Sequence, residues 1–387
     1  MRVGVVIDDL DRRRGGMSEW CWQFVGAAAA RGYELHIVAQ GFGVEALPAR
    51  VMRHRIDRTS SRLAFAESAS QILRRLNLDV VHDMGLGWDF DIFQPHGGSY
   101  AAWQKRRLDI YSPWWRCVKR PIDALLPRHR DHVAHGRKQY ATMQSGATVF
   151  VALSNTVAND FVDLHGIRPE QITVVYNGVD CQRFSPDHRA RYREAVRRQL
   201  GVADETLVLL LAAHNFRLKG VPELLRAAAQ FVANQRAVHV VIAGGKHLEK
   251  WHRAAGRLAP GNHVTFLGAV ADMVPYYAAA DAYVHPTYYD PCSLVLLEAA
   301  ASGLPIVTTR RFNGAAELFR DGENILTLSD PADQRALIES IDALFDERLR
   351  QRLGSAARNV ALAHPFEKNV AEILRLYDKR VPRRLAA

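Results

Sequence analysis

The sequence predicts an α/β protein made of two Rossmann-like domains, each with a parallel sheet covered by helices on both faces. Three observations support this prediction. At 387 residues, the chain is too long for one ordinary hydrophobic core. Short apolar runs alternate with helical stretches of ten or more residues, which is the pattern of βαβ units. The alternation occurs on both sides of a turn-rich stretch, Asn177–Pro186.

The first half of the chain is expected to form one domain, residues 1–180. Its β-type runs predict strands at Val3–Ile7, Leu35–Ala39, Val80–His82, Val149–Leu153 and Ile172–Val175. Helices between them are expected at Met17–Arg31 and Ala64–Leu76.

The second half is expected to form the other domain, residues 181–363. Strands are predicted at Leu207–Ala212, Val238–Ala243, Val264–Leu267, Ala282–Val284 and Ile306–Thr308, and helices at Val221–Ala233, Leu294–Ala301 and Ala332–Phe345. A last helix begins near Phe366, and the segment of about 364–387 is expected to pack back on the first domain. Because doubly wound sheets bind ligands at the carboxyl ends of their strands, two such domains face to face would form a deep cleft.

Composition narrows the class of protein. Hydrophobic residues make up 48% of the chain and charged residues 24%, as in folded globular proteins. The four cysteines form no CxxC pair, which is typical of a reducing cytoplasm. No secretory signal and no long apolar run is present, so we expect a soluble or peripheral protein. The net charge of +10 serves either solubility or attraction to a polyanion, such as nucleic acid, anionic lipid or a phosphorylated glycolipid.

The most informative segment is residues 285–305, HPTYYDPCSLVLLEAAASGLP. A strand ends at His285, a loop carries Asp290, and a helix that contains Glu298 begins near Ser293. The free N–H groups of such a helix start attract anions. The amides could therefore hold a diphosphate while the carboxylates accept sugar and ribose hydroxyls. Alternatively, Asp290 or Ser293 only caps the helix and Glu298 is a solvated residue.

This pattern resembles the E-x7-E signature of the family 4 retaining glycosyltransferases, which have the GT-B fold. Asp290 replaces the first Glu, and Ser293 stands where the family usually has Gly. Residues 175–186 resemble the family's interdomain N-G-V-D-x-x-x-F-x-P, residues 213–220 its first loop in the C-terminal domain, and Gly15-Gly16 its glycine turn near the donor phosphates. The resemblance implies a transferase that uses a nucleotide-sugar donor.

The resemblance also implies roles for four charged side chains. Arg217 and Lys219 would neutralise the charge that grows on the leaving diphosphate, so that neither a metal nor another cofactor is expected. Glu298 would accept from ribose hydroxyls, and Asp290 from the transferred hexose. The family's preferred mechanism is a front-face displacement in which the leaving phosphate takes the proton of the acceptor. Alternatively, Arg217 and Lys219 form a solvated pair at a turn.

Further donor contacts follow from the same resemblance. His96 would approach the sugar, unless it is simply structural, and backbone groups near Gly268 would hold the base, for which uridine is expected. The remaining implied donor contacts are Gly15, Gly16, Cys292, Ser293 and Leu294. The G-x-G-x-x-G fingerprint of dehydrogenases is missing, which speaks against a nicotinamide enzyme.

Between residues 101 and 150 the chain carries ten basic residues against three acidic ones, with tryptophan and tyrosine interleaved. This mixture is typical of a headgroup interface. We expect an acceptor or membrane contact from Trp103, Lys105, Arg106, Arg107, Trp114, Trp115 and Arg116. The same mixture can bind single-stranded nucleic acid, but no RNA- or DNA-binding motif accompanies it. Alternatively, the segment is a solvated helical excursion whose tryptophans lie in the core.

Within the family, the layout is most similar to the lipopolysaccharide core glucosyltransferase type. This implies a glycolipid or oligosaccharide acceptor, a role in lipopolysaccharide core or cell-surface glycan synthesis, and a peripheral position at the inner face of the cell membrane. Two alternatives remain open. One is a non-catalytic nucleotide-sugar or lipid-binding protein of the same fold, and the other is a transferase with a soluble acceptor.

Overall fold

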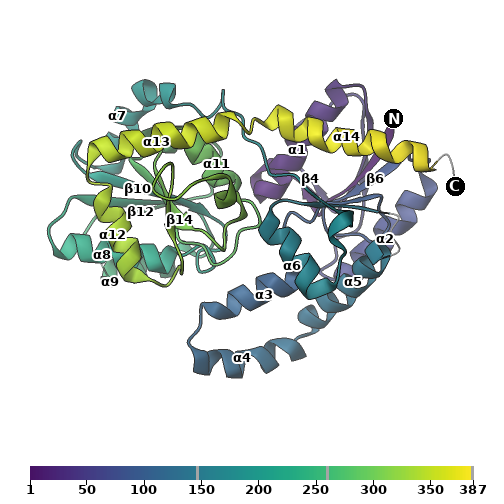
Figure 1. Cartoon of the computed structure of the whole chain (residues 1–387), viewed down its shortest axis with the longest axis horizontal. Coiled ribbons are helices and arrows are strands. Elements are labelled where there is room, and N and C mark those ends of the chain that lie inside the picture. The colour runs from purple at the N-terminus through teal and green to yellow at the C-terminus, as the bar shows by residue number, and fades with distance from the viewer. Residues whose placement is uncertain (145–147, 259–260, 385–387) are drawn as a thin grey trace. The chain divides into compact units, whose positions relative to one another are not determined.

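The computed structural model describes residues 1–144, 148–258 and 261–384, with side chains described as far as residue 379. The chain forms two compact units. The first is Met1–Tyr176 together with the segment that begins at Glu367, and the second is Asn177–Phe366. Each unit is built on a twisted parallel sheet with helices packed against it (Figure 1). The predicted class of two Rossmann-like domains is confirmed.

The sheet of the first unit has the strand order β5-β3-β1-β6-β7-β8-β9. The strands are β1 (Arg2–Val6), β3 (Glu34–Ala39), β5 (Val51–Arg55), β6 (Val80–Asp83), β7 (Ile92–Phe93), β8 (Val149–Ala152) and β9 (Ile172–Val174), and β2 (Asp9–Leu10) pairs separately with β4 (Gly41–Phe42). Helices α1 (Gly16–Ala30), α2 (Arg62–Arg75) and α6 (Asn155–His165) belong to this unit. The sequence interpretation missed β5, an edge strand rich in exposed polar residues, and β7, which is only two residues long.

Three consecutive helices separate β7 from β8. They are α3 (Tyr100–Asp109), α4 (Pro113–Leu125) and α5 (Pro127–Gln144), and α3 and α4 extend away from the sheet of their unit (Figure 1). Helix α5 is attached to the start of α2 by Asp131, which accepts hydrogen bonds from Ser61 Oγ and the Arg62 amide, both at 2.6 Å. The basic, aromatic segment singled out in the sequence is therefore a helical excursion from the first sheet.

The last helix, α14 (Phe366–Arg384), packs into the first unit. Tyr377 lies buried against β6, with its hydroxyl 2.6 Å from His82 Nδ1. On α1, Trp20 Nε1 donates to Asn369 Oδ1 at 2.9 Å. The expected end of the C-terminal segment, residues 385–387, lies outside the described part of the chain.

The boundary between the units differs from the predicted 180/181. It falls after Tyr176, because Asn177 and Val179 are tied to the second unit. Asn177 Nδ2 donates to the carbonyl of Cys292 at 2.8 Å. The Val179 amide donates to His364, and Val179 forms a bridge with Pro365.

The sheet of the second unit has the order β12-β11-β10-β13-β14-β15. The strands are β10 (Leu207–Ala213), β11 (Val238–Gly244), β12 (Val264–Gly268), β13 (Ala282–His285), β14 (Ile306–Thr309) and β15 (Leu326–Leu328). The helices are α7 (Arg189–Leu200), α8 (Val221–Ala233), α9 (Leu248–Leu258), α10 (Val274–Ala279), α11 (Leu294–Ala301), α12 (Gln334–Ala343) and α13 (Glu347–Leu362). The short strand β15 was not predicted.

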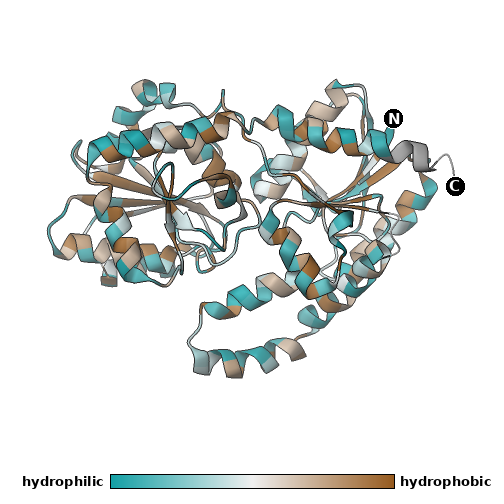
Figure 2. Ribbon diagram, viewed as in Figure 1, coloured by the Kyte–Doolittle hydropathy of each residue, from teal (hydrophilic) through white to brown (hydrophobic). Residues whose placement is uncertain are grey.

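The hydrophobic core of the second unit is formed around the central strands of its sheet. Strands β10 and β11 are almost wholly buried, and the central strands of both sheets are strongly apolar (Figure 2). A buried carboxylate, Asp281, joins α7 to the start of β13, because it pairs with Arg193 at 2.6 Å and Arg197 at 3.0 Å. Among the described helices, none combines the length and the apolar composition needed to cross a bilayer.

Candidate functional site

The strand order of the second unit reverses between β10 and β13. These strands are hydrogen-bonded neighbours, yet β11 and β12 lie between them in the sequence. Ligands of open parallel sheets bind at such a switch point, outside the carboxyl ends of the strands. The loops that leave this point are residues 214–220 after β10 and residues 286–293 after β13. They carry five of the predicted donor-binding residues, namely Arg217, Lys219, Asp290, Cys292 and Ser293.

An ion pair joins these two loops. Lys219 Nζ lies 2.7 Å from Asp290 Oδ2 and 2.9 Å from the carbonyl oxygen of Tyr289. The two charged side chains are only 19% and 13% exposed, so water screens their attraction less than it would at an open surface. The structure thus brings together two residues that are 71 positions apart in the sequence and that we predicted to act on one donor.

Glycine at position 220 allows the loops to approach each other so closely. Its backbone has a φ of 76°, and a Cβ atom there would lie 2.1 Å from the carbonyl oxygen of Pro286. Two positions earlier, the carbonyl oxygen of Leu218 accepts hydrogen bonds from the Tyr288 amide at 2.8 Å and from Thr287 Oγ1 at 3.2 Å. Any side chain at Gly220 would push the two loops apart and separate Lys219 from Asp290.

The start of α11 follows directly after Asp290. Ser293 is buried, and its Oγ accepts from the amide of Leu296 at 3.3 Å, so it caps this helix. Leu294 is half-buried, and its amide donates to no acceptor in the described part of the chain. Cys292 is buried, with its carbonyl held by Asn177. The amide of Leu294 is therefore available to an anion at the N-terminus of α11.

Glu298 lies one turn into α11 and is oriented by a residue that the sequence interpretation missed. The hydroxyl of Tyr277 lies 2.8 Å from Glu298 Oε2 and 3.2 Å from the carbonyl of Val295. Burial, followed by the charge of Glu298, raises the pKa of Tyr277 well above its usual range. Tyr277 therefore keeps its proton and acts as a donor to the carboxylate. No local pattern around Tyr277 distinguishes it from an ordinary core tyrosine.

Arg217 and Gly268 lie apart from this ion pair. Arg217 is exposed in the loop after β10, and its side chain forms no hydrogen bond or ion pair within the described residues. Gly268 ends β12, the edge strand, two strands away from β10. Among the described residues, no three His, Cys, Asp or Glu side chains are grouped as a metal ion would require. The expectation that no metal is needed remains a prediction.

A buried histidine completes the floor of the site. His285 is the last residue of β13, it is fully buried, and neither of its ring nitrogens has a hydrogen-bond partner in the described chain. Burial, followed by the positive charge of Lys219, lowers the pKa of His285 to about 3. Its ring is therefore neutral at physiological pH. The position was visible in the sequence as a strand end, but nothing there distinguished it from a structural histidine.

The predicted residues of the first unit follow strands of their own sheet. Gly15 precedes α1 and has a φ of 128°, a backbone conformation that residues with a side chain rarely adopt. Gly16 is the first residue of that helix. His96 follows β7, and its ring packs 4.5 Å from that of Trp20. Burial, followed by the effect of His82, lowers the pKa of His96 to about 3. His96 is thus a neutral side chain and could offer only an uncharged hydrogen bond.

The tryptophans of α4 are exposed, which rules out the alternative that they are core residues. Trp114 is 65% exposed and Trp115 is 53% exposed. With Val118, Ile122 and Leu125, which are also exposed, they fall on one stripe roughly 100° wide at 3.6 residues per turn. We call these five side chains the apolar stripe of α4.

The cations predicted around the stripe are not all free. Arg107 is paired with the buried Asp123. Arg116 joins α4 to the end of α3 through Asp109 at 3.3 Å and the carbonyl of Tyr111 at 2.7 Å. Arg106 lies 3.8 Å from Asp109 as well, whereas Lys105 is exposed. Trp103 is half-buried against Tyr100. The three acidic residues of the excursion therefore hold the helices together, which charge counting did not reveal.

Comparison with known proteins adds family matches over both units. A family model described as "Glycosyltransferase Family 4" matches residues 14–183, and one described as "Glycosyl transferases group 1" matches residues 192–360. The chain is 33% identical over 257 residues to a D-inositol 3-phosphate glycosyltransferase of Geodermatophilus obscurus. That match covers 61% of this chain and 54% of the relative, so the chain spans about half the length of that relative.

Two solved structures show the same fold over nearly the whole chain. WaaG, a glycosyltransferase involved in lipopolysaccharide biosynthesis, superposes with a TM-score of 0.81 at 22% identity, covering 96% of this chain and 98% of WaaG. Anabaena HepE, in complex with UDP and glucose, superposes with a TM-score of 0.71 at 20% identity, covering 97% of this chain and 98% of HepE.

Proposed function

The chain belongs to the family 4 glycosyltransferases of the GT-B fold, and we propose that it transfers a hexose, with retention, from a UDP-sugar to a membrane-associated glycolipid. The contact of Lys219 with Asp290 at the switch point is the observation that carries this proposal. It places a cation and a carboxylate side by side, next to the start of a helix. A nucleotide-sugar needs such a combination, because it presents a diphosphate and hydroxyls close together.

The proposed donor site works by exchanging partners. An incoming diphosphate takes Lys219 Nζ as a counter-ion and meets the free amide at the start of α11. Asp290 then loses its internal partner and accepts a hydroxyl of the hexose. Glu298, oriented by Tyr277, accepts from the ribose. The exposed guanidinium of Arg217 turns toward the phosphates.

In the proposed transfer step, the bond between the anomeric carbon and the diphosphate oxygen breaks as the acceptor oxygen bonds to the same face. The leaving phosphate takes the acceptor's proton. Negative charge grows on the diphosphate during this step, so fixed cations stabilise the transition state more than the ground state. Lys219 and Arg217 would supply this charge, which supports metal-independent transfer. UDP as the nucleotide is supported by HepE, which shares the fold and whose structure holds UDP and glucose.

The acceptor side of the proposal rests on α4. The apolar stripe offers side chains that partition into a headgroup region, and Lys105 and Arg120 are exposed cations nearby in the sequence. Each such cation contributes about 1 kcal/mol near anionic lipid. These features support a peripheral enzyme at an anionic membrane face, with a glycolipid acceptor as in lipopolysaccharide or other cell-surface glycan synthesis. WaaG, with the same fold, is described as acting in lipopolysaccharide biosynthesis.

A soluble acceptor is the second candidate, because a relative at 33% identity is named for D-inositol 3-phosphate. Co-sedimentation with vesicles separates the two candidates. Binding to vesicles that contain phosphatidylglycerol, but not to neutral vesicles, would support the membrane-associated acceptor. Failure to bind either kind, together with transfer to inositol phosphate, would establish the soluble one.

The proposed donor site is tested by measuring how UDP-, GDP- and ADP-sugars and the free nucleotides change the thermal stability of the protein. A ligand present at about 100 times its Kd should add about 2.7 kcal/mol to the free energy of unfolding. We expect a clear shift with uridine nucleotides and a loss of that shift in Glu298→Ala. The matched control is Glu249→Ala, since Glu249 lies on a different helix of the same unit, α9. Equal shifts with all nucleotides, or none with any, would reject the donor site.

A further inference from the structure

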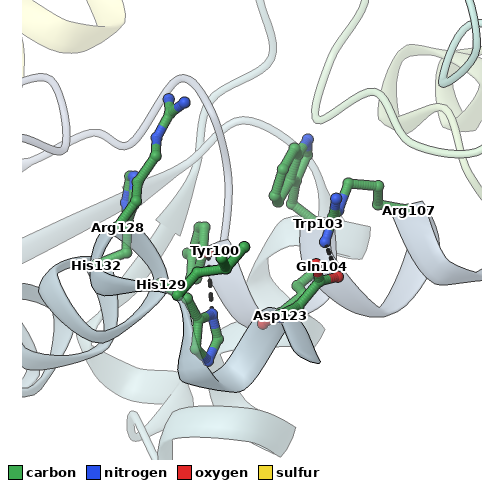
Figure 3. Close-up of a pocket in the computed structure, with 9 residues that line it drawn as sticks. Tyr100, Trp103, Gln104, Arg107, Asp123, Arg128, His129 and His132 are labelled. Atoms are coloured by element: carbon green, nitrogen blue, oxygen red, sulfur yellow. Dashed lines mark hydrogen bonds and ion pairs between the residues drawn. The ribbon is translucent and has the colours of Figure 1, made fainter. Parts of the chain in front are cut away.

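Helices α3, α4 and α5 surround a pocket of about 390 Å³ within the first unit (Figure 3). This volume is near the lower end of the roughly 300–1,000 Å³ typical of small-molecule sites. Tyr100 and Trp103 of α3, Leu126 between α4 and α5, and Arg128 of α5 are among its lining residues. The pocket is separate from the donor site, which belongs to the second unit.

The aromatic rings of the pocket are stacked on one another. The ring of Tyr100 lies parallel to that of His132, with 4.4 Å between centroids, and is also stacked on Trp103 at 5.6 Å. The guanidinium of Arg107 lies 5.2 Å from the centroid of Trp103. Tyr100 and Trp103 therefore form a stacked wall in which Trp103 lies next to both the Tyr100 ring and the Arg107 guanidinium. The hydroxyl of Tyr100 lies 3.1 Å from His129 Nδ1, so it is already engaged within the pocket (Figure 3).

Charge around the pocket is positive overall. Asp123, the one acidic residue of the lining, is already shared by Arg107 and by Lys119 at 3.6 Å. Arg128 is exposed at the opposite side of the aromatic side chains from Arg107 (Figure 3). Neither the guanidinium of Arg128 nor the amide of Gln104 has a hydrogen-bond partner among the described residues. An anion that carries hydroxyl groups would give both of these polar groups a direct partner, which a neutral alkyl chain cannot do.

We propose that this pocket binds a phosphorylated sugar ring, with the phosphate at Arg128 and a hydroxyl at Gln104. The inference deepens the proposed function, because such a ring would belong to the acceptor. Leu126 links the pocket to the membrane side, since it lines the pocket, is 48% exposed, and directly follows the last member of the apolar stripe of α4. A glycolipid could therefore lie along α4 and place its headgroup in the pocket.

Calorimetric titration of the full chain with glucose 6-phosphate, glucose and inorganic phosphate tests this assignment. We expect glucose 6-phosphate to bind at least about tenfold more tightly than either of the others, because it alone engages both polar groups. Arg128→Gln should weaken its binding by at least about tenfold. The matched control is Arg130→Gln, two positions along α5, which removes the same charge from a residue that does not line the pocket.

A second arm identifies the source of the sugar phosphate. Vesicles of phosphatidylglycerol are compared with the same vesicles containing lipid A, which presents phosphorylated glucosamine. If the ligand is a lipid headgroup, lipid A raises vesicle affinity in the wild type and in Arg130→Gln, but not in Arg128→Gln. If it is a free sugar phosphate, only the calorimetric arm depends on Arg128. Both outcomes support the pocket.

Two results would overturn the assignment. Inorganic phosphate binding as tightly as glucose 6-phosphate would show a simple anion site, and an Arg128→Gln variant equal to wild type in both arms would remove the pocket from recognition altogether. UDP binding, measured in the same samples, keeps the two proposals apart. Loss of UDP binding with intact sugar-phosphate binding would refute the proposed donor site and leave this pocket in place.

Discussion

The loops after β10 and β13 in the second unit differ sharply from α4 in the first. The loops are bonded to each other through Lys219, Asp290 and Leu218, and the helix that follows them is capped by Ser293. Helix α4 instead exposes the five large side chains of its apolar stripe and is held to its neighbours by ion pairs at Asp109 and Asp123. One region is preorganised internally, and the other has a face without an internal partner.

This difference agrees with the two ligands proposed for the regions, a nucleotide-sugar at the loops and a membrane surface at α4. A charged leaving group demands donors and cations that are already in place, because reorganisation would cost part of the rate enhancement. A fluid surface makes no such demand and requires only that apolar area and positive charge lie on one side of a helix. We therefore expect substitutions in the loops to affect turnover, and substitutions in the apolar stripe of α4 to affect membrane binding rather than turnover.

The largest effect is expected for Lys219→Met, which removes a cation from the proposed transition state and leaves Asp290 without its partner. The value of kcat/KM should fall about 100-fold, or about 2.7 kcal/mol. Steady-state assays with the best donor of the nucleotide panel measure it. Lys250→Met, on α9, is the control and should keep wild-type kinetics. A kcat/KM for Lys219→Met within twofold of the wild-type value would contradict the proposed role of Lys219 in the transfer step.

Glu298→Ala should have a somewhat smaller effect, at least about tenfold on kcat/KM or about 1.4 kcal/mol, because it removes a neutral hydroxyl contact. Tyr277→Phe should change the same parameters in the same direction but by less, since the carboxylate remains and loses only its orienting donor. An increase in the KM for the donor, with little change in kcat, would identify both as binding residues. Unchanged donor KM in both variants would contradict the assignment.

On α4, Trp114→Ser combined with Trp115→Ser should weaken binding to anionic vesicles by about tenfold or more, because two large aromatic contacts are lost. Transfer to a soluble acceptor analogue and UDP binding should not change. Leu164→Ser, another exposed apolar residue of the first unit, serves as the control on α6. Loss of UDP binding in the double variant would show that the two tryptophans support the fold. It would contradict their assignment to membrane binding alone.

The smallest effect concerns His285 beneath the site loops. Its folded-state pKa of about 3 lies below the ordinary value of 6.5, so the unfolded chain takes up a proton first. Its contribution to stability is complete above pH 6.5 and declines as the pH falls toward 3. Between pH 7 and pH 6 the free energy of unfolding should fall by about 0.7 kcal/mol from this residue.

Denaturation of His285→Asn at the two pH values measures this contribution, since the variant should lose less stability on acidification than wild type. His247→Asn, at an exposed position, should retain the full wild-type dependence. Identical pH dependence in His285→Asn and wild type would show that the floor of the site is open to water.

Much of the fold was predictable because its signals are local. The alternation of apolar runs and helices correctly predicted the central strands of both sheets, and α8 and α11 begin and end at the predicted residues. The strands that were not predicted, β2, β4, β5, β7 and β15, are short or lie at sheet edges. There, neighbouring strands rather than the residues themselves decide the conformation. The boundary near Asn177 was displaced for the same reason, since a contact with Cys292 decides it.

Patterns in neighbouring positions were enough to predict the two-sheet class and the concentration of positive charge with aromatic residues near α4. The donor-binding roles of residues in the loops after β10 and β13 stay a prediction. Contacts between distant parts of the chain pair Lys219 with Asp290 and orient Glu298 through Tyr277. Packing likewise turns Trp114 outward and makes Trp103 line a pocket. Residue type sets what a side chain can bind. Which partner it meets depends on strand order and helix rotation, and these follow from packing of the whole unit.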